Sequence, residues 1–128
     1  MKTLFTIIVP VIFIGFILSA GLPVNKSVQK GGSFYPAEVK KVIDTKCYGC
    51  HSDQGKSRDA KDALLWDSLP DLSKTSQVAT LDHIIKVLKD KKMPPEGAVK
   101  KYPEMKLSAE ESGILQSWAE AKAESLLK

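Results

Sequence analysis

Arginine is nearly absent from this chain. Of the nineteen basic residues only Arg58 is an arginine, and the formal net charge is +4. Proteins that recognise nucleic acid rely on bidentate arginine contacts and on aromatic side chains interleaved with basic ones. The composition therefore argues against nucleic acid as a partner. The abundant lysines suit solubility and weak docking to acidic proteins.

The sequence also lacks the alternation of apolar and polar residues that marks a half-buried strand, and it contains no internal repeat. Helical patterns occur over residues 36–47, over residues 76–90 and from Ser108 onward, where Ser108 and Glu111 have the spacing of a capping box. The polar stretch 52–62 is expected to be an exposed loop, residues 63–70 a short helix or turn, and the proline-rich stretch 91–103 to hold no regular element. We expect one all-α domain over residues 36–128.

The beginning of the chain has the pattern of an export signal. One lysine precedes an uncharged apolar run over residues 4–20, and small residues at Ser19 and Gly21 predict cleavage before Leu22. The run is also long enough for a retained membrane anchor. Residues 1–21 are therefore expected to be a signal peptide or an anchor, and residues 22–35 a flexible linker. Either leader predicts a periplasmic body, soluble or tethered to the inner membrane.

Cysteine and histidine are scarce, and most of them lie together. Both cysteines and one of the two histidines occur in the stretch CYGCH, residues 47–51. In an exported protein a thiol pair is expected to be oxidised, metal-bound or otherwise occupied. C-x-x-C-H is the spacing of covalent haem attachment, in which two thiols reach two vinyl groups and the histidine binds the iron. We predict one haem c, linked through Cys47 and Cys50 and ligated by His51.

Other uses of the motif fit the chain less well. A structural zinc site needs four converging ligands, and the chain offers only the three in the motif together with His83. A thioredoxin-like disulfide belongs in a βαβ unit, which the sequence lacks. A structural disulfide across two residues, as in a non-haem interaction module, would close a very small loop and stabilise little.

The second axial position on the iron decides between electron transfer and chemistry at the metal. His83, Met93 and Met105 are the candidates. On the helix expected over residues 76–90, His83 lies about 200° from Leu81 and away from the apolar stripe, so it is expected to face water. Met93 is stiffened by the two prolines that follow it, and we predict it as the ligand. Met105 is expected in the core.

Four segments, VKKVIDTKCYGCHS, LLWDSL, KKMPPEG and YPEMKLSAEESGILQSWAE, together resemble the small bacterial haem-binding domain of the cytochrome c type. The resemblance covers roughly residues 36–120, and its most specific part is the pattern P-E-x-K-L-S-x-E-E before the last helix. It implies a compact relative of class I cytochrome c, with His51 as proximal ligand and Met93 opposite. Several family members keep an N-terminal anchor. The polar loop 52–62 departs from the family, which often has aromatic residues there.

These observations predict an electron carrier rather than an enzyme, one that passes single electrons between redox partner proteins. The side chains expected to wall the haem pocket are Tyr48, Trp66, Leu81, Ile85, Leu88 and Trp118. Lysines flanking Met93 are expected to form a docking face for an acidic partner: Lys89, Lys91, Lys92, Lys100 and Lys101. The alternative is a haem protein with an open distal site, acting as a peroxidase or gas sensor, which needs a polar distal donor.

Overall fold

The computed structural model describes residues 33–128 of the chain. Throughout this range the secondary structure is helical and contains no strand, which confirms the all-α prediction for these residues. The predicted leader and most of the predicted linker lie outside it. In chain order the elements are α1 (Ala37–Val42), the π-helical turn η1 (Ile43–Cys47), α2 (Arg58–Ala63), the 3₁₀ turn η2 (Leu69–Asp71), α3 (Lys74–Lys89), α4 (Glu96–Lys101), the 3₁₀ turn η3 (Pro103–Met105) and α5 (Ala109–Leu127).

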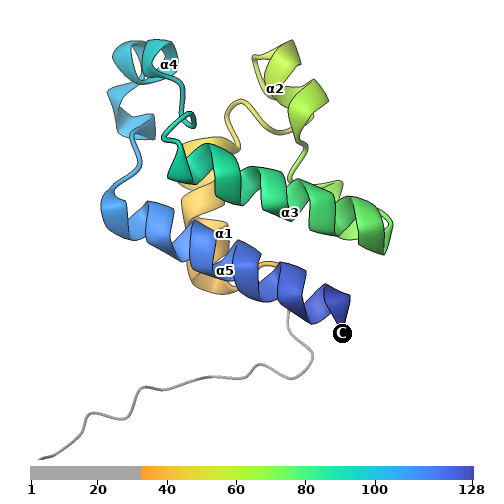
Figure 1. Ribbon diagram of the computed structural model, residues 1–128. Helices are drawn as coiled ribbons and strands as arrows, with labels where there is room; N and C mark the ends of the chain where they lie inside the picture. The colour runs from red at the N-terminus through yellow and green to blue at the C-terminus, as the bar shows by residue number, and fades with distance from the viewer. Residues whose placement is uncertain (1–32) are drawn as a thin grey trace, which may run out of the picture.

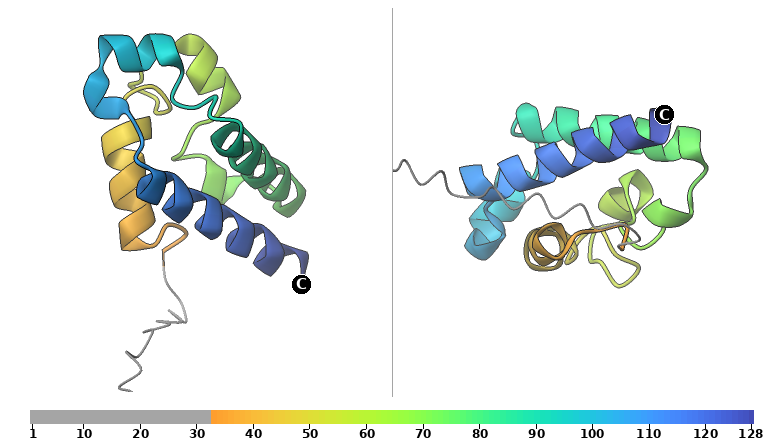
Figure 2. Two further views of the ribbon diagram at one scale, coloured as in Figure 1. Left: turned by 60° about the vertical axis from the view of Figure 1, so that its left-hand side comes forward. Right: turned by 90° about the horizontal axis from the view of Figure 1, so that it is seen from below.

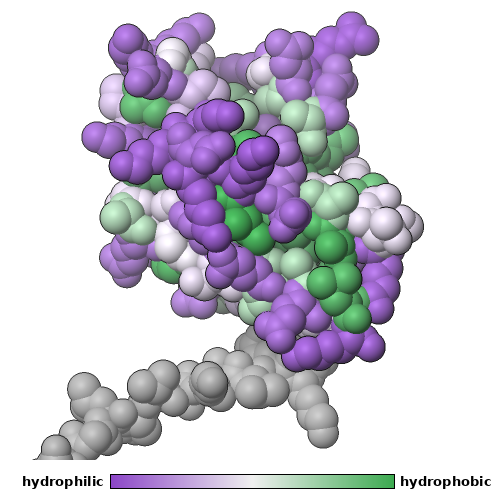
Figure 3. Space-filling view, in the orientation of Figure 1, coloured by the Kyte–Doolittle hydropathy of each residue, from purple (hydrophilic) through white to green (hydrophobic). Residues whose placement is uncertain are grey.

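The two long helices, α3 and α5, pack side by side, and α1 packs against α5 (Figures 1 and 2). The short helices α2 and α4 lie beyond α3, on the side away from α5 (Figure 1). Hydrophilic side chains cover most of the face seen in Figure 3, and apolar residues show only as patches between them. Within the range described, no helix combines the length and the apolar character needed to cross a bilayer.

The core forms where the apolar stripe of α3 meets α5. Leu81, Ile84 and Leu88 follow the helical spacing of three and four residues, and all three are buried. They pack in one cluster with Leu115 and Trp118 of α5. Burying one such leucine contributes roughly 1.5–3 kcal/mol, so this seam fixes the relative placement of the two long helices.

Two aromatic residues at the end of the predicted linker belong to the folded body. Phe34 and Tyr35 pack against the core. The Trp118 indole N–H donates to the Phe34 carbonyl at 3.3 Å, and the Tyr35 hydroxyl donates to the Trp66 carbonyl at 2.5 Å. Burial raises the pKa of Tyr35 above its ordinary value. The packed structure therefore begins before Pro36.

Two short helices occur where the sequence predicts none. In the expected loop 52–62, Ser57 caps α2 by accepting from the Ala60 N–H at 3.2 Å. In the stretch 91–103, α4 begins directly after Pro95. The prediction of no regular element in the second stretch is wrong, and that of a loop in the first is wrong for its second half. A proline at a helix start removes no needed donor, so the prolines begin α4 instead of preventing it.

The expected long helices are present with shifted boundaries. α3 begins at Lys74 because Ser73 accepts from the Ser76 N–H at 3.3 Å as its N-cap. The helix expected over residues 36–47 changes after Val42 from α to the wider π form. At α5 the reciprocal capping box between Ser108 and Glu111 is confirmed.

The turn after α3 has a left-handed residue that is not glycine. Lys91 has φ 54°, its N–H donates to the Leu88 carbonyl at 3.1 Å, and the Lys92 N–H donates to the Val87 carbonyl at 2.8 Å. This is the hydrogen-bond pattern of a Schellman motif, whose left-handed position favours glycine. The motif ends α3 and leads directly into Met93.

Replacing Lys91 by glycine is expected to raise the free energy of unfolding by about 1 kcal/mol, because the steric cost of a side chain in the left-handed region disappears. Lys86→Gly, at an exposed position inside α3, should lower it by about 1 kcal/mol. Urea denaturation followed by circular dichroism measures both. Equal destabilisation by the two glycines would contradict the prediction.

Candidate functional site

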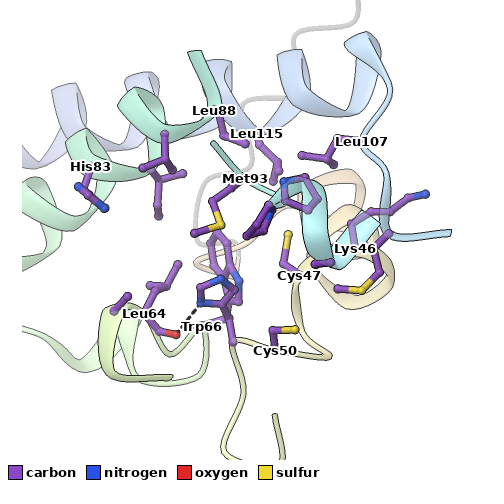
Figure 4. Close-up of a pocket in the computed structure, with 18 residues that line it drawn as sticks. Lys46, Cys47, Cys50, Leu64, Trp66, His83, Leu88, Met93, Leu107 and Leu115 are labelled. Carbon is purple, nitrogen blue, oxygen red and sulfur yellow. Dashed lines mark hydrogen bonds between the residues drawn. The ribbon is translucent and has the colours of Figure 1, made fainter. Parts of the chain in front are cut away.

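One cavity brings together the residues that the sequence singles out. Cys47, Cys50, His51 and Met93 all line it, and Figure 4 shows the Met93 side chain pointing into it. Its empty space is about 750 Å³, part of it open to solvent. Most of the remaining lining is apolar and comes from α3, α4, α5 and the segments between them.

The π-helical turn η1 carries the first cysteine to the cavity. It ends at Cys47, whose carbonyl accepts from the Cys50 N–H at 3.1 Å and from the His51 N–H at 3.0 Å. These two bonds fold the motif into a tight turn, so that both thiols and the imidazole reach the same cavity. π-Helical turns are uncommon and occur frequently at functional sites.

The segment from Leu64 to Asp67 holds the motif in place. His51 Nδ1 lies 3.1 Å from the Leu64 carbonyl (dashed line in Figure 4), the Trp66 N–H donates to the His51 carbonyl at 3.1 Å, and the Tyr48 hydroxyl donates to Asp67 at 2.5 Å. The hydrogen bond to Asp67 raises the pKa of Tyr48. A carbonyl can only accept, so Nδ1 carries the hydrogen. Nε2 of His51 is then the ring nitrogen left for a metal.

His83 is exposed, as predicted, and yet it lines the edge of the cavity. His83, Ile84, Val87 and Leu88 form the cavity-facing side of α3. This side overlaps the buried stripe at Ile84 and Leu88 and extends beyond it at His83 and Val87. Periodicity identifies the face of a helix that meets the core, and it does not identify a cavity next to that face. Met105, expected in the core, is half-buried and also lines the cavity.

The predicted pocket walls are correct only in part. Trp66 and Leu88 line the cavity, whereas Tyr48, Leu81, Ile85 and Trp118 do not. Leu81 and Trp118 are instead buried in the seam between α3 and α5. The lining that the sequence did not indicate includes Ile84, Val87, Ala98, Leu107 and Leu115.

The donors around the cavity fit a covalently held haem. Two thiols, one imidazole and a thioether are the groups that such a cofactor needs, and each comes from a residue of the lining. The cavity wall also contains Trp66, whose buried indole N–H has no hydrogen-bond partner within residues 33–128. An unpaired buried donor costs about 1–3 kcal/mol. A ligand that carries carboxylates, as haem does, could supply the missing acceptor.

Burial raises the pKa of the Cys47 thiol to about 12, and the nearby Glu111 and Cys50 add to the shift. In the chain before any thioether forms, we expect Cys47 to alkylate far more slowly in the folded than in the urea-unfolded state at pH 8. Only about one folded thiol in ten thousand is then ionised. Iodoacetamide labelling with peptide mass spectrometry measures the two rates, and equal rates would contradict the expectation.

The raised pKa of Cys47 makes the stability of the folded chain depend on pH. The unfolded thiol ionises near its ordinary pKa of 9.0, and the folded thiol near 12. The free energy by which the buried Cys47 thiol stabilises the folded state is therefore fully present below pH 9. It is lost as the pH rises towards 12.

Comparison of the chain with known protein families, with curated proteins and with solved structures finds no match. The resemblance to small bacterial cytochromes c therefore stays a prediction. Function is inferred from the cavity and the residues that line it.

Proposed function

We propose that this chain is a monohaem c-type cytochrome, which carries single electrons between redox proteins outside the cytoplasm. The observation that carries the proposal is the convergence of CYGCH and Met93, which are far apart in the sequence, on one apolar cavity. The helices around this cavity would then form a cytochrome c-like shell. No residue of the chain is proposed to act as an enzyme catalyst.

Each residue of the site has a separate task in this proposal. Cys47 and Cys50 would hold the haem through two thioether bonds, and His51 and Met93, which line the same cavity, would be the ligands of its iron. The Leu64 carbonyl orients the His51 ring through Nδ1. A bound haem would supply one-electron chemistry between ferrous and ferric iron. A methionine ligand and an apolar lining both favour the ferrous state.

Two protein ligands would leave the iron without a position for a substrate, and this favours a carrier over an enzyme. The second candidate, a peroxidase or gas sensor with an open distal site, has one observation in its favour. His83 lies at the edge of the same cavity as Met93 and could act as a polar donor there. The coordination of the iron in the loaded protein separates the two functions.

The test is to produce the full chain in a bacterium that has haem-attachment machinery. Mass spectrometry should give the polypeptide plus one haem, and the Cys47→Ala/Cys50→Ala variant should lose its haem on acid and organic extraction. Optical spectra should be low-spin, with the weak near-infrared band of sulfur bound to ferric iron. A high-spin spectrum would support the open-site candidate. A colourless protein with the mass of its amino acids alone would overturn both.

A further inference from the structure

Two leucines are exposed at one end of the helix pair formed by α3 and α5. Leu127, the last residue of α5, is 71% exposed, and Leu72, directly before the N-cap of α3, is 39% exposed. No other large apolar side chain is exposed within residues 33–128. Because α3 and α5 run in opposite directions, the end of α5 lies beside the beginning of α3 (Figures 1 and 2). These two leucines and the half-buried Leu126 are called the leucine tip below.

The leucine tip is an apolar surface with little net charge around it. Leu126 packs against the core and continues the surface inward from Leu127. Figure 3 shows apolar surface beside the C-terminal end of α5, on a face that is otherwise mostly hydrophilic. Charges of both signs flank the leucines in the sequence: Asp71, Lys74, Glu124 and Lys128, of which the last two form a salt bridge at 2.9 Å. A partner of the tip would therefore be held by apolar contact.

The chain enters the folded body close to the leucine tip. Phe34, the second of the residues described, packs against Trp118 of α5 with 6.1 Å between the ring centroids. The Lys122 ammonium lies 4.3 Å from the centre of the Phe34 ring. Lys122 precedes Leu126 by one turn of α5, so these two side chains are neighbours on the helix. The chain before residue 33 therefore joins the body about one helical turn from the tip.

The sequence before this point can act as a tether. Residues 4–20 form the apolar run expected to be a signal peptide or a retained anchor, and residues 21–32 connect it to the body. A segment of that length spans at most roughly 40 Å when fully extended. If residues 4–20 stay in a bilayer, the body is held within this distance of the lipid. A short tether raises the effective concentration of a second contact to about the millimolar range, so a weak contact is sufficient.

We infer that the leucine tip is a membrane contact, which lays this end of the body on the bilayer that retains residues 4–20. Leu72, Leu126 and Leu127 would enter the boundary between the headgroups and the acyl chains, where apolar side chains of peripheral helices bind. The retained segment would supply the attachment, and the tip would supply the orientation of the body. The inference rests on retention of residues 4–20 and not on the presence of haem.

Two other occupants fit the leucine tip less well. A second copy of the chain would need a stable interface, which buries roughly 800 Å² on each partner, far more than three leucines present. The connecting residues 21–32 contain three branched aliphatic side chains, separated by polar residues and glycines: Leu22, Val24 and Val28. This segment has little apolar surface with which to cover the tip. A lipid surface requires neither a large interface nor a complementary sequence.

A bilayer at the leucine tip would leave the cavity at the far end of the helix pair. α3 lines the cavity with residues of its second half, and α5 lines it with Leu115. Leu115 and Leu127 are about 18 Å apart along the axis of α5. Contact at the tip would therefore keep the cavity away from the lipid and accessible to soluble partners.

The first experiment places a photo-cross-linker on the leucine tip of the full chain. Benzoylphenylalanine replaces Leu127 in one variant and, in the control, Lys100, an exposed residue of the cavity-lining helix α4. Each chain is purified from bacterial membranes and reconstituted into phosphatidylcholine vesicles. Illumination should attach phospholipid at position 127 at least about fivefold more than at position 100. Equal attachment at the two positions would mean that the body has no preferred orientation, and the inference would fail.

The second experiment asks whether the leucines themselves hold the contact. The cross-linker now replaces Leu72, and either Leu127→Glu or the control Gln54→Glu is added, each of which adds one negative charge at an exposed position. Lipid attachment at position 72 should fall at least about fivefold with Leu127→Glu and stay unchanged with Gln54→Glu. It should persist in about 1 M salt, where the screening length is about 3 Å. Loss of attachment in salt would assign the contact to charged residues and overturn the inference.

The products of these reactions identify any other occupant. Cross-links from position 127 to a second chain would indicate a dimer interface, and cross-links to residues 21–32 of the same chain would indicate that the connecting segment covers the tip. A chain whose mass shows that it begins at Leu22 would have no tether. Each of these results overturns the inference and leaves the proposed function standing. A colourless protein that attaches lipid at position 127 would refute the proposed function alone.

Discussion

Replacing Met93 by alanine is expected to convert the haem-loaded protein from low-spin to high-spin and to abolish the near-infrared band of the sulfur–iron bond. Met93 lies in the cavity with His51, on a short connection between the turn after α3 and α4. Alanine has no donor atom, and the neighbouring Pro94 and Pro95 offer none. Loss of the thioether should also lower the reduction potential, because methionine ligation favours ferrous iron.

Met105→Ala is the matched control, because it removes the second thioether of the same cavity. It should leave the spin state and the band unchanged. A Met93→Ala protein that stays low-spin without the band would indicate that another group has replaced the methionine, and a Met93→Ala/His83→Ala protein would show whether His83 is that group. If the band persists in Met93→Ala and disappears in Met105→Ala, the assignment of the ligand is wrong.

The sequence predicts the candidate ligand residues of the site better than it predicts the side chains that wall the cavity. CYGCH specifies two thiols and an imidazole by spacing alone, and the prolines after Met93 mark a stiff segment in the sequence. The side chains that wall the cavity are set by tertiary packing. Leu81 and Ile84 belong to the same apolar stripe, yet only Ile84 lines the cavity. Periodicity does not distinguish a core-facing residue from a cavity-facing one.

Short helices were the weakest part of the prediction of the fold. α2 and α4 have six residues each and no fully buried side chain, so they carry little of the apolar pattern by which helices are recognised. The capping box of α5 could be predicted because its two side-chain contacts join residues only three positions apart, Ser108 and Glu111. Phe34 and Tyr35 pack against Trp66 and Trp118, which are distant in the sequence. Because Phe34 and Tyr35 follow a polar stretch, the sequence places them in the linker.

Gly55→Ala is expected to destabilise the protein by about 1–3 kcal/mol and to reduce the fraction of chains that acquire haem. Gly55 is buried, and a Cβ at this position would overlap the backbone carbonyl of Cys50. The Gly55 N–H also donates to the Ser52 carbonyl at 2.8 Å, which closes the turn after the motif. A backbone carbonyl cannot rotate away as a side chain can, so the strain is transferred to the second cysteine.

Gly49, inside the motif, provides the comparison. A Cβ there meets no atom within 4 Å, so Gly49→Ala should change stability by less than about 0.5 kcal/mol and leave haem attachment intact. Urea denaturation gives the stabilities, and the mass of the exported chain gives the fraction attached. Gly55→Ala keeps all five residues of CYGCH and disturbs the backbone at Cys50 and Ser52. If haem attachment falls in Gly55→Ala but not in Gly49→Ala, attachment depends on the fold around the motif. If attachment is equal in the two variants, the spacing of the cysteines is sufficient.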